Sequence, residues 1–309
     1  MSTETQSVKT YPGRDAVLSK GWMAAHKWLI LRRVSQFVIL GLFLVGPLLG
    51  TWIVKGNLTS SLTLGVLPLS DPFVLLQSAL SGHVLASTAL TGAAIVLIFY
   101  AIVGGRAYCS FVCPMNVVTD AALWVAKRLN LPKGWQPSRD TRFWLLGAVL
   151  VSAPLTGVMA WELLNPVTML HRGLVYGGSF VWTVALAIFI FDLVLSRRGW
   201  CGHLCPMGAF YGLVGRASVA RVSAVKRRDC NDCMDCFAVC PEPHVITPAL
   251  RGADNGVGPV ILSGDCTNCG RCIDVCAKDV FRFDVRFRNA APEGEGRDDT
   301  AISSDRHAA

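Results

Sequence analysis

The chain has 309 residues, of which 52% are hydrophobic and only 16% are charged, and its net charge is +8. Its mean hydropathy of +0.45 excludes an ordinary soluble domain and predicts membrane-spanning helices. The positive charge does not indicate a nucleic-acid partner, because the basic residues are spread over short segments beside the apolar stretches, where they act as a topology signal.

A polar leader occupies residues 1–33 and lacks the pattern of a cleavable signal peptide. Four apolar stretches follow, each long enough to cross a bilayer as a helix of about 20 residues. Lys and Arg number six in the leader, six in residues 104–142 and seven in residues 196–228, against one in each remaining loop. This imbalance predicts a multi-pass protein of the bacterial inner membrane with both termini in the cytoplasm. The expected spans are residues 34–54, 84–103, 143–161 and 175–195.

The predicted membrane domain, residues 34–228, consists of two related units with two helices each. Asp71-Pro72 in the first outer loop corresponds to Asn165-Pro166 in the second, and both are typical helix starts, with a capping side chain followed by proline. Each unit ends in the sequence Cys-x-x-x-Cys-Pro. We expect a duplicated unit that brings both cysteine pairs to the cytoplasmic border of the membrane.

The two Cys-x-x-x-Cys-Pro motifs pair Cys109 with Cys113 and Cys201 with Cys205. Three interpretations fit this spacing. The four thiolates share a further iron–sulfur cluster, or each pair works as a redox-active dithiol, or all four are structural thiols. His203 lies inside the second motif, and it is either a ligand or an ordinary polar residue of an interface.

Eight further cysteines form two copies of the pattern Cys-x-x-Cys-x-x-Cys-x-x-x-Cys within residues 229–288. This spacing is typical of two [4Fe–4S] clusters, in which the fourth cysteine of each copy binds the cluster of the other copy. Zinc, the competing metal, prefers separated cysteine pairs or mixed Cys and His ligands. We therefore expect an α-helical integral membrane protein with four transmembrane helices and a C-terminal α+β dicluster ferredoxin-like domain. The predicted ligands are Cys230, Cys233, Cys236 and Cys276 for the first cluster, and Cys266, Cys269, Cys272 and Cys240 for the second.

Two other parts of the chain carry weaker signals. Residues 289–309 contain one large apolar residue and are expected to form a disordered tail. The outer loops place proton-accepting side chains beside tryptophan, as a quinol site at the membrane edge requires, although interfacial tryptophan and polar loops explain the same residues without a ligand. These candidates are His83, Trp161, Glu162, Asn165, His171 and Arg172.

The order of these elements resembles the NapH family of membrane ferredoxin-type proteins. The resemblance rests on four spans, on CSFVCP and CGHLCP after the second and fourth of them, and on CNDCMDCFAVCPEPH followed by CTNCGRCIDVC. It implies oxidation of quinol, with ubiquinol from the membrane quinone pool as the substrate. It also implies electron transfer to a periplasmic iron–sulfur partner of the NapG type and onward to a periplasmic nitrate reductase.

Two functions from different classes are compatible with the chain. The first is an electron-transfer subunit of a quinol dehydrogenase, which acts only in a complex. The second is a redox assembly or maturation factor for a periplasmic metalloenzyme, with the Cys-x-x-x-Cys-Pro pairs as working thiols. The first function requires electrons to cross the membrane, because about 30 Å of hydrocarbon separate a cytoplasmic ferredoxin domain from a periplasmic acceptor.

Overall fold

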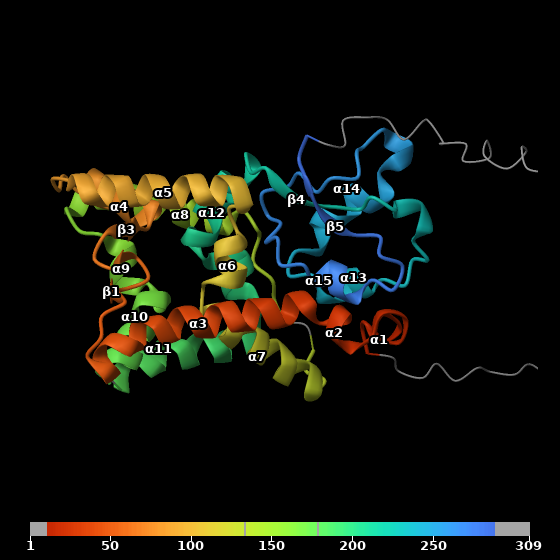
Figure 1. The fold of residues 1–309 in the computed structure, drawn as a ribbon, viewed down its shortest axis with the longest axis horizontal. Coiled ribbons are helices and arrows are strands. Elements are labelled where there is room, and N and C mark those ends of the chain that lie inside the picture. The colour runs from red at the N-terminus through yellow and green to blue at the C-terminus, as the bar shows by residue number, and fades with distance from the viewer. Residues whose placement is uncertain (1–10, 133, 178, 288–309) are drawn as a thin grey trace, which may run out of the picture.

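A computed structural model describes residues 11–132, 134–177 and 179–287 of the chain. The protein is elongated, with four long helices along its long axis, short elements at one end and the cysteine-rich domain at the other (Figure 1). The long helices are α3 (Lys27–Leu49), α5 (Ser87–Val103), α8 (Thr141–Thr156) and α11 (Ser179–Ile190), the last of which continues in a π-helical turn, Phe191–Leu195.

The four apolar stretches form helices, but three of them are short. Among the described residues, α3 is the one helix long and apolar enough to cross a bilayer, whereas α5, α8 and Trp182–Leu195 are apolar and have 17 residues or fewer. At 1.5 Å per residue, a helix of 17 residues extends about 25 Å, which is less than a hydrocarbon core of about 30 Å.

The expected boundaries of the four spans are too wide at their distal ends. Glycines in the left-handed conformation end α3 at Gly50, with φ 72°, and α8 at Gly157, with φ 66°. Val54 therefore lies in a strand, while Trp161 and Val175 lie in short helices. The sequence pattern did not separate these elements from the spans because their residues are also apolar.

The end of the molecule far from the cysteine-rich domain is a distal cap of short elements, residues 54–80 and 160–176 (Figure 1). The two predicted helix starts are confirmed: Asp71 Oδ1 accepts a hydrogen bond from the Phe73 N–H at 2.8 Å, and Asn165 Oδ1 accepts one from the Val167 N–H at 3.1 Å. A three-stranded antiparallel sheet in the order β1-β2-β3 was not expected. The elements are β1 (Val54–Gly56), β2 (Ser60–Thr63), β3 (Leu67–Ser70), α4 (Pro72–Leu80), α9 (Ala160–Leu164) and α10 (Pro166–Tyr176).

At the opposite end, each Cys-x-x-x-Cys-Pro motif lies between two helical segments. The first motif spans α6 (Ala107–Phe111) and the start of α7 (Met115–Arg128). The second spans a π-helical turn (Trp200–Leu204) and the start of α12 (Pro206–Arg216). The two units therefore have the same local architecture around their cysteines.

The cysteine-rich domain is small and has α+β structure. Its sheet pairs β4 (Ala220–Ser223) with β5 (Arg282–Val285) in antiparallel register. Buried Val222, Ile246 and Phe281 form its core together with several of the cysteines. Its helices are α13 (Asp235–Val239), α14 (Ile246–Arg251) and α15 (Arg271–Val275), with 3-10 turns at Arg227–Asp229, Pro243–Val245 and Ala253–Asn255.

The N-terminal segment packs against the cysteine-rich domain through α1 (Arg14–Lys20), α2 (Trp22–Ala25) and the start of α3. The Trp28 and Leu29 N–H groups donate to the Asp274 carboxylate at 3.1 and 2.9 Å, and Lys20 forms an ion pair with Asp279 at 2.5 Å. The leader therefore ties the first long helix to the domain nearly 250 residues later in the sequence. The predicted disordered tail, residues 289–309, lies outside the described residues.

Candidate iron–sulfur and cysteine sites

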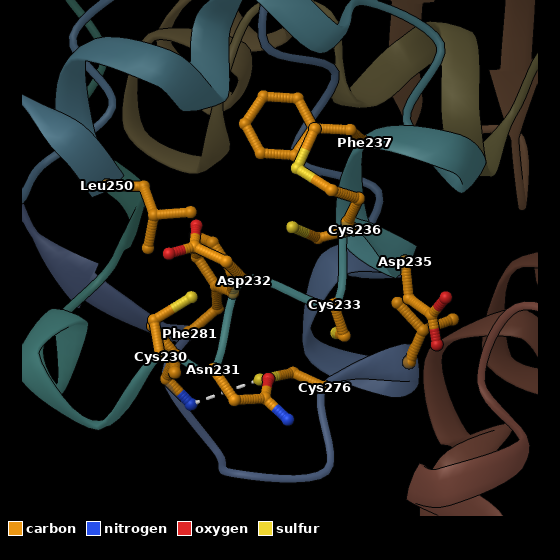
Figure 2. A pocket seen from close by; sticks show the side chains of 13 residues that line it. Cys230, Asn231, Asp232, Cys233, Asp235, Cys236, Phe237, Leu250, Cys276 and Phe281 are labelled. Carbon is orange, nitrogen blue, oxygen red and sulfur yellow. Dashed lines mark hydrogen bonds between the residues drawn. The ribbon is translucent and has the colours of Figure 1, made fainter. Parts of the chain in front are cut away.

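All twelve cysteines are free thiols. Four of them surround one small cavity of the cysteine-rich domain. Figure 2 shows Cys230, Cys233, Cys236 and Cys276 placed around this cavity, with Phe237 and Phe281 among the apolar side chains near them. The first cavity thus brings together three cysteines of the first motif and the last cysteine of the second.

A second small cavity has the reciprocal arrangement. Cys266, Cys269 and Cys272 of the second motif line it together with Cys240, the last cysteine of the first motif. The spacing of the sequence predicts the same two groups of four. Cys236 and Cys272, one from each group, lie within electrostatic reach of each other, so the two cavities are neighbours.

The loops that carry the first three cysteines of each motif have the same unusual backbone. Positive φ angles occur at Asp232 (54°) and Met234 (64°) in the first loop and at Asn268 (46°) and Gly270 (70°) in the second. Three of these residues have side chains, for which this conformation is disfavoured, and such strain concentrates at ligand sites. The shared conformation turns the chain around each cavity so that its three thiols face inward.

These cavities fit iron–sulfur clusters by their donor sets. Each is ringed by four thiols from two separate segments and closed by apolar side chains, which is the environment of a [4Fe–4S] cluster. Within the described ranges, no three His, Cys, Asp or Glu side chains converge closely enough to hold a single metal ion. When bound, a cluster at each position supplies one-electron transfer.

The four remaining cysteines come together at the junction between the two ends of the molecule, and we call them the cysteine tetrad: Cys109, Cys113, Cys201 and Cys205. Burial, followed by the charge of Cys109, raises the pKa of the Cys205 thiol to about 12. Burial and the charges of Cys113 and Cys205 likewise raise the pKa of Cys201. Each unit of the duplication therefore contributes two thiols to one group.

The proline that follows the second cysteine of each motif starts a helix. Cys205 is the N-cap of α12, and its Sγ accepts a hydrogen bond from the Gly208 N–H at 3.4 Å. At the equivalent place, the N–H groups of Met115 and Asn116 lower the pKa of Cys113, although burial and nearby thiols raise it more. The Cys-Pro pair thus directs the free N–H groups of a helix N-terminus at a sulfur atom, which stabilises negative charge there.

The tetrad lies against the second cavity. The Ser110 hydroxyl, between the two cysteines of the first motif, donates to the Thr267 carbonyl at 3.0 Å, and Thr267 lines the second cavity. Arg106 links the same parts, because its guanidinium donates to the Cys201 carbonyl at 3.2 Å and to the Asp265 carbonyl at 2.8 Å. The sequence-predicted cysteines therefore follow one another in space as tetrad, second cavity and first cavity.

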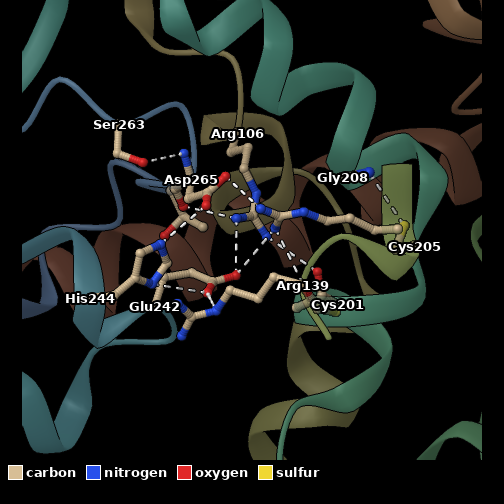
Figure 3. Close-up of polar contacts among 12 residues, drawn as sticks. Arg106, Arg139, Cys201, Cys205, Gly208, Glu242, His244, Ser263 and Asp265 are labelled. Carbon is tan, nitrogen blue, oxygen red and sulfur yellow. Dashed lines mark hydrogen bonds and ion pairs between the residues drawn. The ribbon is translucent and has the colours of Figure 1, made fainter. Parts of the chain in front are cut away.

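A buried network of charges holds the cysteine-rich domain on the tetrad (Figure 3). Glu242 forms ion pairs with Arg106 at 3.1 Å, with Arg142 at 3.5 Å and with Arg139 at 3.5 Å. Arg142 also contacts Asp265 at 2.5 Å. The side chains of Glu242, Arg106 and Arg142 are 3% exposed or less. Sequence reasoning treated these arginines only as topology signals, and it did not identify Glu242.

A second network lies on the other side of the junction and is centred on Asp120 of α7. Its carboxylate contacts Arg33 at 2.5 Å, Arg198 at 2.9 Å and Arg271 at 2.6 Å. Burial acts to raise the pKa of Asp120, but the charges of Arg271 and Arg198 outweigh it and lower that pKa to about 2. The network joins α3, α7 and the cysteine-rich domain, since these arginines come from three different parts of the chain.

Of the remaining sequence-predicted candidates, His203 lies in the same turn as Cys201 and the others lie in or near the distal cap. His203 lies near Glu242 and Ser138, and burial lowers its pKa. In the distal cap, Asn165 caps α10, Trp161 packs near Phe73 with ring centroids 6.3 Å apart, and Glu162 and Arg172 approach each other to 4.0 Å.

His171 is the buried histidine of this group. Its ring packs edge-on against Phe43 of α3, with the centroids 5.0 Å apart. His83 lies between α4 and α5. The six outer-loop candidates for a quinol site thus lie in and around the distal cap, where Glu162 contacts both Asn165 and Arg172.

Comparisons with known proteins agree with these sites. The family described as "4Fe-4S binding domain" matches residues 85–132 and 178–226, once in each unit, and the family described as "4Fe-4S dicluster domain" matches residues 229–280. No solved structure matches the chain.

Several curated proteins match nearly the whole chain. The methylamine utilization ferredoxin-type protein MauN of Methylorubrum extorquens is 52% identical over 90% of this chain and 96% of its own length. MauN of Paracoccus denitrificans is 54% identical over 88% and 95%. The ferredoxin-type protein NapH of Escherichia coli is 47% identical over 90% and 96%. The chain therefore belongs to the family of ferredoxin-type 4Fe–4S electron-transport proteins that includes NapH and MauN.

Proposed function

We propose that the protein is the electron-transfer subunit of a membrane quinol dehydrogenase, which takes electrons from quinol and delivers them through iron–sulfur clusters to a periplasmic enzyme system. The observation that carries this proposal is the spatial order of the cysteines. The tetrad lies at the end of the four apolar helices and against the second cavity, and the second cavity adjoins the first. In this proposal the three cysteine sites form a series of one-electron carriers, and the first carrier, the tetrad, lies beside the apolar helices that an apolar substrate can reach.

In this proposal the protein holds three [4Fe–4S] clusters. The ligands of the first two are the two groups of four thiols that surround the cavities of the cysteine-rich domain. The tetrad supplies the ligands of the third cluster. The gathering of its four thiols supports this assignment, and so does the match of both units to a 4Fe–4S binding family.

We also propose that all four long helices cross the inner membrane, with both termini and the cysteine-rich domain in the cytoplasm. The excess of Lys and Arg at that end supports this orientation. Large apolar side chains are exposed on these helices, among them Leu48, Trp144 and Leu155 at 76%, 80% and 79%. The shorter helices span when the bilayer thins locally around them.

Reporter fusions test this topology. Green fluorescent protein fused after residue 287 should fluoresce, and alkaline phosphatase inserted after Gly65 of the distal cap should be active, because phosphatase folds only in the periplasm. The reverse pattern, with a dark terminal fusion and an inactive cap fusion, contradicts the proposed orientation. Expression levels of both fusions serve as the control.

The relatives suggest two candidate partner systems for this protein. The 47% identity to NapH supports an iron–sulfur partner of the NapG type and a periplasmic nitrate reductase. Methylamine oxidation is the second candidate, because two MauN proteins are 52% and 54% identical to the chain. The two candidates differ in the direction of electron flow, because nitrate reduction consumes electrons from quinol whereas methylamine oxidation releases electrons.

One experiment tests the substrate and the acceptor together. Anaerobically purified protein should develop the EPR signals of reduced clusters when a short-chain ubiquinol is added, and an oxidised acceptor should then remove them. A NapG-type protein that reoxidises the clusters supports the nitrate system, and clusters that stay reduced in its presence contradict that partner. Clusters that dithionite reduces but quinol leaves oxidised would contradict quinol dehydrogenase activity.

A further inference from the structure

An apolar cavity of about 420 Å³ lies between α3 and α5. Side chains of the two helices line it together with residues of the sheet of the distal cap, and Tyr108 of α6 and Tyr211 of α12 complete the lining. Figure 1 shows the order of these elements along the molecule, with β3 at one end of α5 and α6 at the other. The volume is within the usual range of about 300 to 1,000 Å³ for sites that bind small molecules.

A few polar groups converge on this otherwise apolar space. Asp71 lines it, and the Tyr211 hydroxyl donates a hydrogen bond to Asp71 Oδ2 at 3.1 Å. The hydroxyl of Tyr108 is buried and has no hydrogen-bond partner among the described residues. A buried hydroxyl without a partner is costly, so it indicates a ligand with a polar atom at this position.

We propose that this cavity binds the ring of the quinol and that the Asp71 carboxylate accepts its protons, an assignment that rests on the quinol oxidation proposed above. An apolar ring with a hydroxyl at each end matches a slot with apolar walls and a few convergent polar groups. None of the six outer-loop residues singled out by the sequence lines the cavity. The site instead uses residues of α3, α5, α6 and α12 together with the helix cap at Asp71.

The proposed step balances in atoms and charge. Quinol loses two O–H bonds, two protons and two electrons and leaves as quinone. The electrons reduce two oxidised iron–sulfur clusters of the protein by one electron each. Asp71 accepts one proton, passes it outward, and then accepts the second.

The cavity adjoins the cysteine tetrad through stacked tyrosines. The rings of Tyr108 and Tyr211 lie parallel, with centroids 5.0 Å apart and an interplanar angle of 15°. Tyr108 directly precedes Cys109 in α6, and Val112, which also lines the cavity, directly precedes Cys113. The two tyrosines belong to one apolar cluster against which Cys109, Cys113 and Cys205 pack, so a quinol ring in this space lies near the tetrad.

The carboxylate nearest in effect to Asp71 is Glu162 of α9, whose charge acts on Asp71. Glu162 is largely buried, and its carboxylate approaches the exposed Arg172 guanidinium to 4.0 Å. In this proposal Glu162 is the next acceptor for protons that leave Asp71 toward the distal cap.

The pKa of Asp71 suits this task. Burial raises the pKa of this carboxyl to about 6, while hydrogen bonds from the Phe73 and Val74 N–H groups and from Tyr211 act in the opposite direction. A carboxylate accepts a proton only when it is ionised. The rate of quinol oxidation should therefore rise as pH increases through about 6 and level off above it.

Few other charges face Asp71. Besides Glu162 from α9, the titratable groups near it are three tyrosines, Tyr100 of α5, Tyr108 of α6 and Tyr211 of α12. Burial raises the pKa values of Tyr108 and Tyr211 well above their ordinary value, so both remain neutral over the physiological range. The pH dependence near 6 thus reports Asp71.

Filling the cavity tests the binding site without reference to activity. Ile95 of α5 lines the cavity, whereas Ile98 of the same helix is 60% exposed and does not. Ile95→Trp should weaken the binding of a short-chain ubiquinone to the purified holoprotein at least 10-fold in calorimetry, and Ile98→Trp should leave it unchanged. Equal affinities in the two variants would overturn the site.

Asp71→Asn tests the proton acceptor. The variant should fold, because asparagine is an equally good helix cap and Asn165 already caps α10 in the second unit. It should bind quinone with nearly unchanged affinity, lower the rate of quinol-driven cluster reduction by about 100-fold, and lose the rise in rate near pH 6. Reduction by dithionite should be unaffected.

The outcomes separate this proposal from the general function. If wild-type clusters are reduced by quinol and Asp71→Asn reacts at the wild-type rate and pH dependence, the role of Asp71 is wrong and quinol oxidation stands. If quinol leaves the wild-type clusters oxidised, quinol dehydrogenase activity is wrong, and the calorimetric comparison of Ile95→Trp with Ile98→Trp still decides whether the cavity binds quinone.

Discussion

Replacing Cys109, Cys113, Cys201 and Cys205 together by serine is expected to lower the iron and sulfide content by about four atoms each per chain. The expectation follows from the four thiols lying in one group that receives two cysteines from each unit. The eight cysteines of the other cavities are untouched in this variant. Their clusters should therefore retain their EPR signals with dithionite and lose their reduction by quinol, because the first site after the quinol is missing.

Single variants sharpen this result. Cys109→Ser and Cys201→Ser come from different units, and each should remove the same cluster if the four thiols share it. Ser110→Ala is the matched control, because it alters the same loop without removing a thiol and loses only the hydrogen bond to Thr267. Unchanged iron in all the cysteine variants, together with failed maturation of the partner enzyme, would support the alternative of an assembly factor with working dithiols.

Cysteine spacing predicted a large part of this site. The grouping of three cysteines with the last cysteine of the other motif could be derived because short spacings fix which thiols can face one cluster. The same argument did not choose between the interpretations of the tetrad. Its two halves are 92 residues apart in sequence, and only the fold determines whether they meet.

The charge networks and the proposed quinol cavity could not be derived from the spacing of residues in the sequence. Arg106 and Arg198 lie three residues before the first cysteine of their motifs, yet in the sequence they are indistinguishable from topology signals. Their buried partners, Glu242 and Asp120, lie far away in sequence. One usable signal was Asp71, because the first unit has a charged cap where the second has neutral Asn165.

The apolar helices show a related limit. Hydropathy located all four of them, but their ends depend on backbone conformation. Gly50 ends α3 in the left-handed conformation, and the apolar residues after it form a strand of the distal cap. Val54 of that strand lines the proposed quinol cavity. Because the predicted span included this residue, the sequence analysis did not identify it as part of a site.

Glu242→Gln is expected to destabilise the folded protein by about 3 to 5 kcal/mol, because it leaves the buried Arg106 guanidinium without its paired carboxylate and leaves Arg142 with Asp265 alone. Glu242 is the shared partner of Arg106 and Arg142, and all three side chains are 3% exposed or less. Thermal unfolding of the detergent-solubilised holoprotein and limited proteolysis of the cysteine-rich domain measure the effect. Asp232→Asn is the matched control, because its ion pair with Arg251 is 2.8 Å long but exposed, and such pairs contribute about 0 to 1 kcal/mol.

A double variant identifies the cause of this loss. Arg106→Met combined with Glu242→Gln removes one of the unpaired charges, so the combined loss should be smaller than the sum of the two single losses. Strictly additive losses, or a Glu242→Gln variant as stable as Asp232→Asn, would contradict the role of the network in docking. Because Arg106 also bonds the Cys201 and Asp265 carbonyls, a loosened junction should slow quinol-driven reduction of the ferredoxin clusters while their iron content stays constant. The same buried charges that hold the domain in place would then set how fast electrons cross from the tetrad to the second cavity.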